Sequence, residues 1–330
     1  MLNASKILFL VMLIASTLLS ISSKNWIGIW MGMEMNLMSF IPILAKSKNK
    51  KSSKASMIYF LSQSIGSVLL LFFILINKFI MINPMMVEEI MKIGIIISLL
   101  IKLGAAPFHN WFPMAMNNLK WTEAMILMTW QKITPMYMLS LFMPNKFLFI
   151  SIISSAMIGA IGGLNYTSLT KIMAYSSINH MSWMLIMIQC QMQWFKYLVL
   201  YSLTVLMASS FFNHFNAYFL NQINSMNNTI TEKLTLSSLL LSMGGLPPFL
   251  GFLPKWMAIQ SMINNNMIFV LMFLIMMSML TLFFYMRMIS PLILFYSSMS
   301  KVYFKMEPIK LMSVILFINF LLPLLTIFNF

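Results

Sequence analysis

The chain contains the ten-residue pattern Gly-x-x-Pro-Phe-x-x-x-x-Pro twice, as GAAPFHNWFP at residues 104–113 and as GLPPFLGFLP at residues 245–254. Glycine and proline interrupt helices, yet each copy lies inside a hydrophobic segment. Lys102 precedes the first copy by two residues, and Lys255 follows the second directly. The pattern therefore indicates an internal repeat of two interrupted helices. The helix-breaking residues are Gly104, Pro107, Pro113, Gly245, Pro248 and Pro254.

The composition around these motifs is that of a membrane protein. Hydrophobic residues make up 60% of the 330 residues and charged residues 8%, and the mean hydropathy is +0.88. This leaves too little polar surface for a soluble domain of that length. A transmembrane helix needs about 20 mainly apolar residues, and on that basis the chain has eleven candidate spans. The spans cover residues 6–22, 26–44, 55–77, 86–106, 122–143, 146–163, 167–189, 197–219, 233–262, 267–289 and 309–328.

These spans predict an all-α polytopic membrane protein in which the fourth and ninth helices, which contain the motif, are broken within the membrane. Because the two spans are five apart in order, they cross the membrane in opposite senses, so the repeat is predicted to be inverted. Secondary transporters have this organisation. We expect a single integral membrane domain over residues 1–330. Its repeat-bearing halves cover about residues 86–219 and 233–330, preceded by helices over residues 1–85.

The basic residues predict the orientation of the chain, and the residue usage suggests its origin. If the spans alternate across the membrane, 13 Lys and Arg residues fall on the N-terminal side and four on the other. The 39 Met residues, the single Arg and the lack of Asp indicate an AT-rich mitochondrial gene. We therefore expect a multi-pass protein of the mitochondrial inner membrane, with its N-terminus in the matrix and its C-terminus in the intermembrane space. The net charge of +15 then requires no nucleic-acid partner.

The sequence predicts no cofactor or metal held by this chain. The single cysteine, Cys190, allows neither an internal disulfide nor a thiolate cluster. His109, His180 and His214 lie far apart, without the spacing of metal ligands. Neither a Walker motif nor a glycine-rich dinucleotide fingerprint is present.

Titratable side chains inside the predicted spans are the candidate functional residues. A charge at bilayer depth costs several kcal/mol, so it usually faces a protein interior or a water-filled cavity. The candidates are Glu34, Lys102, Lys132, His180 and Lys255. Burial disfavours the charged form of lysine and a nearby carboxylate favours it, so a Glu34–Lys102 pair could switch Lys102 between holding and releasing a proton. The alternative interpretation is that these side chains only bridge helices.

Five stretches of the chain carry a resemblance to a known family. They are WMGMEMNLMSFIPIL at 30–44, IKLGAAPFHNWFP at 101–113, WQKITP at 130–135, KIMAYSSINHMSW at 171–183 and MGGLPPFLGFLPKW at 243–256. Together they resemble the chain 2 family of mitochondrial NADH:ubiquinone oxidoreductase (respiratory complex I), in an arthropod-like form. That family is similar to the antiporter-like proton-translocating subunits, and the resemblance covers nearly the whole chain in order.

The resemblance implies a membrane-arm subunit that moves protons from matrix to intermembrane space as part of an H⁺-translocating NADH:ubiquinone reductase, without redox chemistry of its own. In the family, four charged residues of these motifs line a hydrated axis. Carried over, they are Glu34, Lys102, Lys132 and Lys255, with His180 as an intermediate relay. NADH, FMN, iron–sulfur clusters and ubiquinone would belong to partner subunits. The implied partners are the other membrane-arm subunits and membrane lipids.

Two other functions stay open on the residues alone. A stand-alone cation/proton antiporter would use the same inverted repeat and the same lysines. A passive scaffold subunit of the complex would keep the polar axis without using it. The second is less favoured, because unused charges inside a membrane are costly to retain.

Overall fold

The computed structural model describes residues 4–45, 49–79, 84–142, 145–226, 230–298 and 310–320. In these ranges the regular structure is helical, apart from an isolated bridge between Ser168 and Phe219. The chain is thus mostly α-helical, as predicted. Both extreme termini and the last part of the eleventh predicted span lie outside the described ranges. So do the predicted matrix-side lysines Lys46, Lys48, Lys301 and Lys305.

The contacts divide the chain into two compact units, Met1–Ser151 and Ile152–Phe330. The first unit contains α1 (Ala4–Ser22), α2 (Trp26–Ala45), α3 (Lys50–Phe79), α4 (Pro84–Leu103), α5 (Trp111–Met116), α6 (Trp121–Met128), the 3₁₀ helix η1 (Trp130–Lys132) and α7 (Ile133–Ser140). The helix α8 (Lys146–Gly162) includes the boundary between the units. The second unit contains α9 (Leu169–Gln189), α10 (Trp194–His214), α11 (Leu220–Met226), α12 (Ile230–Gly244), α13 (Phe252–Asn264), α14 (Ile268–Ser298) and α15 (Lys310–Asn319).

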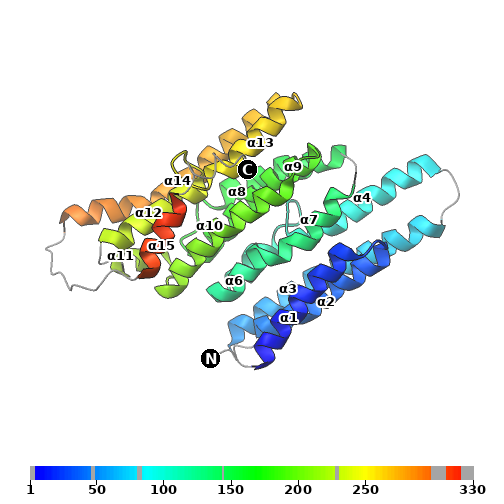
Figure 1. Ribbon diagram of the computed structural model, residues 1–330, viewed down its shortest axis with the longest axis horizontal. Helices are drawn as coiled ribbons and strands as arrows, with labels where there is room; N and C mark the ends of the chain where they lie inside the picture. Colours follow the sequence, from blue (N-terminus) through cyan, green and yellow to red (C-terminus); the bar gives the residue numbers. More distant parts are fainter. Residues whose placement is uncertain are drawn as a thin grey trace. The chain divides into compact units, whose positions relative to one another are not determined.

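In the first unit, α1, α2 and α3 lie side by side (Figure 1), and α3 continues the contacts to α4 and α5. The approach of α1 and α2 is close because Gly32 faces Ser20. A Cβ atom at Gly32 would lie 2.8 Å from the Ser20 Cβ atom. Small residues at such contacts let membrane helices approach each other closely.

In the second unit, α9 is the central helix. Nearly all its residues are buried, and it packs against α10, α13 and α14. The helix α12 packs against α10, α14 and α15, and Figure 1 shows α15, in red, beside it. A helix that is buried on all sides forms the core of its unit. The polar side chains of α9 are therefore enclosed by neighbouring helices.

The described residues include five helices that are long and apolar enough to cross a membrane. They are Ala4–Ser22, Trp26–Ala45, Lys50–Ile76, Trp194–His214 and Ile268–Leu292. Phe269, Met276 and Phe283 follow one another at seven-residue spacing on α14, and each is more than 60% exposed. An exposed apolar stripe of this kind suits contact with lipid or with another membrane subunit. These features fit a multi-pass membrane protein.

One predicted span differs clearly in the structure. Residues 122–143 were expected to form a continuous helix, but the chain forms α6, η1 and α7 instead. Pro135 contributes to this change, because proline cannot donate to the carbonyl of Gln131 and its ring crowds that carbonyl. Thr129, between α6 and η1, has φ −111° and ψ −70°, away from ideal α-helical values. Lys132 consequently lies at the end of a 3₁₀ turn rather than in a regular helix.

Candidate functional site

The first copy of the repeated motif ends α4 with a C-cap. Gly104 has φ +66°, and its N–H donates to the Ile101 carbonyl at 3.2 Å. The N–H of Ala105 donates to the Leu100 carbonyl at 3.1 Å. This pair of bonds is the Schellman motif, in which glycine is favoured because φ is positive. The chain becomes helical again at Trp111, where α5 begins.

The second copy forms the same cap at the end of α12. Gly245 has φ +79° and donates its N–H to the Ser242 carbonyl at 2.9 Å. The N–H of Leu246 donates to the Leu241 carbonyl at 3.2 Å. The next helix, α13, begins at Phe252, which occupies the same position in the pattern as Trp111. The two copies therefore share a helix end, a seven-residue connection and a helix start.

Lys255 closes the second helix end with its own side chain. It lies in the first turn of α13, is buried, and donates from Nζ to the Gly244 carbonyl at 2.6 Å. Gly244 is the last residue of α12, and a cation is favourable at the C-terminus of a helix. A Cβ atom at Gly245 would lie 2.7–2.9 Å from the Lys255 Cδ, Cε and Nζ atoms. Gly245 thus permits the positive φ and also makes room for the ammonium group.

Lys102 has different surroundings. Its buried stem passes Gly66 of α3, where a Cβ atom would lie 2.9 Å from the Lys102 Cγ atom. Its Nζ atom contacts the Met33 Sδ atom of α2 at 3.7 Å, and sulfur is a weak acceptor. Glu34 follows Met33 and acts electrostatically on Lys102. In the part of the chain that the structure describes, these two residues are close without forming a direct ion pair.

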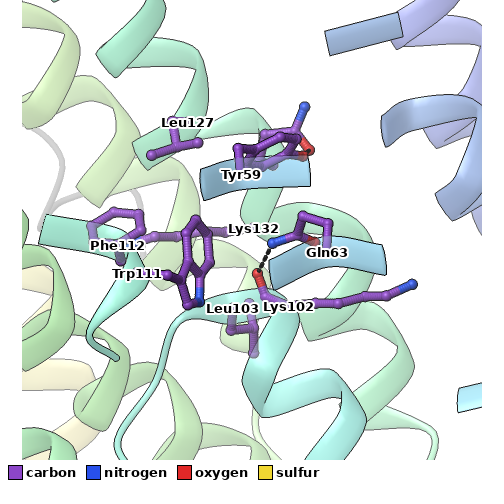
Figure 2. Close-up of a pocket in the computed structure, with 9 residues that line it drawn as sticks. Tyr59, Gln63, Lys102, Leu103, Trp111, Phe112, Leu127 and Lys132 are labelled. Atoms are coloured by element: carbon purple, nitrogen blue, oxygen red, sulfur yellow. Dashed lines mark hydrogen bonds between the residues drawn. The ribbon is translucent and has the colours of Figure 1, made fainter. Parts of the chain in front are cut away.

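Lys102 and Lys132 line one pocket of the first unit (Figure 2), which has room for about one water molecule. The lining residues are Tyr59, Gln63, Lys102, Leu103, Trp111, Phe112, Leu127, Gln131 and Lys132. Lys102 faces the pocket with its backbone carbonyl, which accepts a hydrogen bond from Gln63 Nε2 at 3.1 Å. Figure 2 shows its side chain leading away from the other labelled residues. The Lys132 Nζ atom lies over the Phe112 ring, 5.7 Å from its centroid.

Neutral polar side chains connect this pocket to α2. The Tyr59 hydroxyl donates to Gln131 Oε1 at 3.1 Å, and Gln131 Nε2 donates to Asn36 Oδ1 at 2.9 Å. Asn36 lies two residues after Glu34, and the Glu34 carboxylate also acts electrostatically on Tyr59. These residues were not predicted from the sequence. The available signal was the presence of amides inside apolar spans.

His180 lies in the second unit, on α9. Its Nδ1 atom is 3.0 Å from the Tyr197 hydroxyl, and its ring centroid is 4.9 Å from that of Tyr201. The structure thus places Glu34, Lys102 and Lys132 in the first unit, with both lysines at one pocket. His180 and Lys255 belong to the second unit. Among the described residues, no group of three His, Cys, Asp or Glu side chains could hold a metal ion.

Comparison with known proteins identifies the family. Residues 23–281 match the family described as NADH:quinone oxidoreductase/Mrp antiporter, TM. The NADH-ubiquinone oxidoreductase chain 2 of Anopheles gambiae is 46% identical over 286 residues, covering 85% of this chain and 84% of that relative. The chain 2 of Locusta migratoria is 43% identical over 288 residues, covering 86% and 84%. The chain 2 of Loxodonta africana is 36% identical over 310 residues, covering 89% of this chain and 85% of that relative.

Solved structures of other proteins have the same fold as this chain. A chain of respiratory complex I from Thermus thermophilus with bound aureothin matches with a TM-score of 0.83 at 18% identity, covering 98% of this chain and 78% of that one. A chain of the membrane-bound sulfane sulfur reductase, an archaeal respiratory membrane complex, matches with a TM-score of 0.81 at 14% identity, covering 96% and 72%. The resemblance carried by the five sequence stretches is confirmed. The chain belongs to the family of NADH-ubiquinone oxidoreductase chain 2, within the NADH:quinone oxidoreductase/Mrp antiporter transmembrane family.

Proposed function

We propose that this chain is a core membrane-arm subunit of respiratory complex I and takes part in moving protons from the matrix to the intermembrane space. The observation that carries the proposal is the pocket lined by Lys132 and by the backbone of Lys102, two buried lysines in a membrane protein. Buried ionisable groups beside a polar pocket are typical of ion routes in membranes. Oxidation of NADH and reduction of ubiquinone would take place in partner subunits, which would hold the FMN and iron–sulfur clusters.

Lys102 would act as a switch between two positions. In the structure its ammonium contacts Met33, near Glu34, while its carbonyl faces the pocket. The flexible lysine stem allows the ammonium to turn toward the pocket, and the Met33 sulfur holds it only weakly. A change in the environment of Glu34 would alter the attraction that keeps Lys102 on that side. Lys102 would then pass its proton through pocket water to Lys132.

The onward route would involve His180 and Lys255. In this proposal His180 relays the proton within the second unit, and Lys255 receives it for release or transfer to a neighbouring subunit. Protonation of Lys255 would strengthen its attraction to the carbonyl end of α12. The charge state of Lys255 would thereby be linked to the local structure of the connection at residues 245–251.

The proposed membrane topology is the one predicted by the hydrophobic spans and the basic residues of the sequence. Eleven spans would cross the mitochondrial inner membrane, with the N-terminus in the matrix and the C-terminus in the intermembrane space. The connections at residues 104–110 and 245–251 would lie within the membrane as breaks of an inverted repeat. The whole chain would act as one membrane domain with repeat-bearing halves over residues 86–219 and 233–330.

The proposal is tested with complex I carrying Lys102→Ala. We expect normal assembly and a lower number of protons pumped per NADH oxidised. The matched control is Lys92→Ala, which removes an exposed lysine from the same helix. Proton pumping by Lys102→Ala equal to that of the control would contradict the proposal and favour a passive scaffold.

Assembly is tested separately by native electrophoresis of solubilised inner membrane, with NADH-oxidising activity stained in the gel. We expect the chain, followed by mass spectrometry, to migrate with a very large NADH-active band. Migration as a small species without that activity would instead support a stand-alone cation/proton antiporter.

A further inference from the structure

A group of buried hydroxyls extends from His180 along α9. Ser176 and Ser177 lie one turn before His180, and all three are buried. Three tyrosines from two other helices of the second unit surround them: Tyr197 and Tyr201 of α10, and Tyr285 of α14. Each of these tyrosines is at most 1% exposed. So many enclosed hydroxyls are unusual in an apolar interior, because each needs a partner to offset its loss of water.

The tyrosines contact successive polar groups of α9. Tyr197 pairs with His180, and the Tyr201 ring lies beside the same imidazole. The Tyr201 hydroxyl also lies near Ser177 and Tyr285. The Tyr285 hydroxyl lies beside Ser176. A series of polar groups therefore leads from His180 through Tyr201 to Tyr285.

Within the described part of the chain, the Tyr285 hydroxyl lacks a hydrogen-bond partner. The hydroxyls of Ser176 and Ser177 donate to carbonyls one turn back on α9, at 2.8 and 2.7 Å, so their oxygens remain as acceptors. Although the Tyr285 hydroxyl lies near Ser176, it does not close a hydrogen bond of normal geometry. A buried polar atom without a full hydrogen bond destabilises the fold, because it has lost its hydration without compensation. A buried water molecule at this position would supply the bond.

A second polar atom at the same helix contact also needs a partner. Asn179 Nδ2 contacts Thr281 Oγ1 at 3.5 Å where α9 meets α14, but Asn179 Oδ1 is buried without a hydrogen bond. Thr281 lies one turn before Tyr285 on α14. Two incompletely bonded polar atoms on facing helices support water at the α9–α14 contact.

Cationic side chains lie near the N-terminal end of α9. Arg287, two residues after Tyr285, donates to the carbonyls of Leu164 and Tyr166, which precede α9. Tyr166 stacks on Tyr175 with centroids 5.4 Å apart, and the Lys171 Nζ atom lies 4.5 Å from the Tyr166 centroid. Two cationic side chains thus lie at this end of the unit. By the positive-inside rule, it is the end predicted to face the matrix.

We propose that Tyr201, Tyr285 and a buried water beside Tyr285 form a branch through which His180 exchanges protons with the matrix-facing end of the second unit. The proposal rests on the proposed function. Each oxygen of the branch accepts a proton on one side as it gives up a proton on the other, so no co-reactant is consumed. Tyr201 and Tyr285 act as proton-relay residues, and their rings also fill the space between α9, α10 and α14.

The experiment uses complex I with Tyr285→Phe or Tyr201→Phe, because phenylalanine removes the hydroxyl and keeps the ring. Tyr137→Phe, in α7 of the first unit, is the control for loss of a tyrosine hydroxyl elsewhere. We expect normal assembly and a rate of proton pumping lowered roughly three- to tenfold, the range that loss of one buried hydrogen bond corresponds to. Pumping by both variants equal to that of Tyr137→Phe would overturn the proposal.

Two further results separate the possible failures. If Lys102→Ala lowers pumping while Tyr285→Phe does not, the branch is wrong and the proposed function stands; if neither lowers pumping, the proposed function itself fails. A high-resolution cryo-EM map of the wild-type complex provides a test that needs no variant. We expect water density within hydrogen-bond distance of Tyr285 Oη, and a dry site would contradict the proposal.

Discussion

The two copies of the repeated motif form the same backbone structure but use their lysines differently. Both end a helix with a glycine at positive φ and the same pair of backbone hydrogen bonds. In the first copy, neutral donors satisfy the last carbonyls of α4, because Trp111 Nε1 bonds to Ile101 O at 3.0 Å and Gln63 to Lys102 O at 3.1 Å. In the second copy, the Lys255 ammonium bonds to the last carbonyl of α12.

This difference separates a lysine whose ammonium bonds to no helix-end carbonyl from a lysine whose ammonium does. Lys102 is not needed to cap its helix end, which the proposed switch requires if its ammonium is to respond to Glu34 and to the pocket. Lys255 is part of the helix end itself, so a change in its charge acts on the connection at residues 245–251. The two copies therefore combine one backbone structure with two different lysine contacts.

The strongest test of this contrast compares Gly245→Ala with Gly104→Ala. A non-glycine residue at positive φ costs about 1–2 kcal/mol at either position. At Gly245 the new methyl group would also displace Lys255, and an unpaired Gly244 carbonyl adds about 1–3 kcal/mol. We expect Gly245→Ala to lower the thermal stability of the assembled complex and its protons per NADH more than Gly104→Ala does.

Gly104→Ala is a demanding control, because its Cβ atom would lie 3.0 Å from Phe112 Cβ and 3.1 Å from the Trp111 ring. Both variants therefore combine a positive φ with a close contact, and the displaced lysine is the main difference between them. If both variants lose the same thermal stability and the same number of protons per NADH, then the bond from Lys255 to the Gly244 carbonyl adds nothing measurable at residues 245–251.

The next effect in size concerns Lys255 directly. Lys255→Ala removes the donor to the Gly244 carbonyl, which should weaken the C-cap of α12 by about 1–3 kcal/mol. We expect faster hydrogen–deuterium exchange of the Gly245 and Leu246 amides, measured by mass spectrometry on the assembled complex. Lys102→Ala should leave exchange of the Gly104 and Ala105 amides almost unchanged.

Lys255→Met serves as the packing control, since it retains most of the stem and lacks the donor. If the methionine variant protects these amides as well as lysine does, then packing rather than the ammonium closes the second break. Faster exchange at Gly104 in Lys102→Ala would likewise remove the contrast between the two lysines.

A smaller effect is expected at the neutral cap of the first copy. Trp111→Phe removes the indole N–H from the Ile101 carbonyl, a loss of about 0.5–1.5 kcal/mol. The second copy already has a phenylalanine, Phe252, at this position, and there Lys255 provides the charged donor. The variant should moderately lower the midpoint of thermal inactivation, whereas Trp194→Phe, at the start of α10, should change it less. Equal shifts would argue against a capping role for Trp111.

The helix ends of the repeat were predictable from the sequence, but the capping partners were not. The motif predicted interruptions near Gly104 and Gly245 because glycine favours the left-handed C-cap, and α4 and α12 do end at Leu103 and Gly244. Their depth in the membrane stays a prediction. The bond from Lys255 to Gly244 depends on how the chain turns back over ten residues, which hydropathy and residue spacing do not specify.

The charged members of the site were predictable for a similar reason. A charged side chain inside an apolar span costs several kcal/mol, so such residues are rare and easily recognised in the sequence. Lys102 and Lys132 were predicted on this basis alone. The neutral members, such as Gln63 and Gln131, give a weaker signal because burying an amide costs less than burying a charge. The 3₁₀ turn at Lys132 was missed because a proline can also be tolerated inside a membrane helix.

The smallest expected effect tests what holds Lys102 on the α2 side. Met33→Leu removes the sulfur that contacts Lys102 Nζ while nearly preserving side-chain volume, and such exchanges usually cost less than about 1.5 kcal/mol. We expect assembly and protons per NADH close to wild type, because the attraction to Glu34 is unchanged in this variant. Glu34→Gln keeps the shape of the side chain, removes its charge, and should lower pumping more. The reverse order would mean that Lys102 is positioned by local packing, and the first break would then hold its lysine much as the second does.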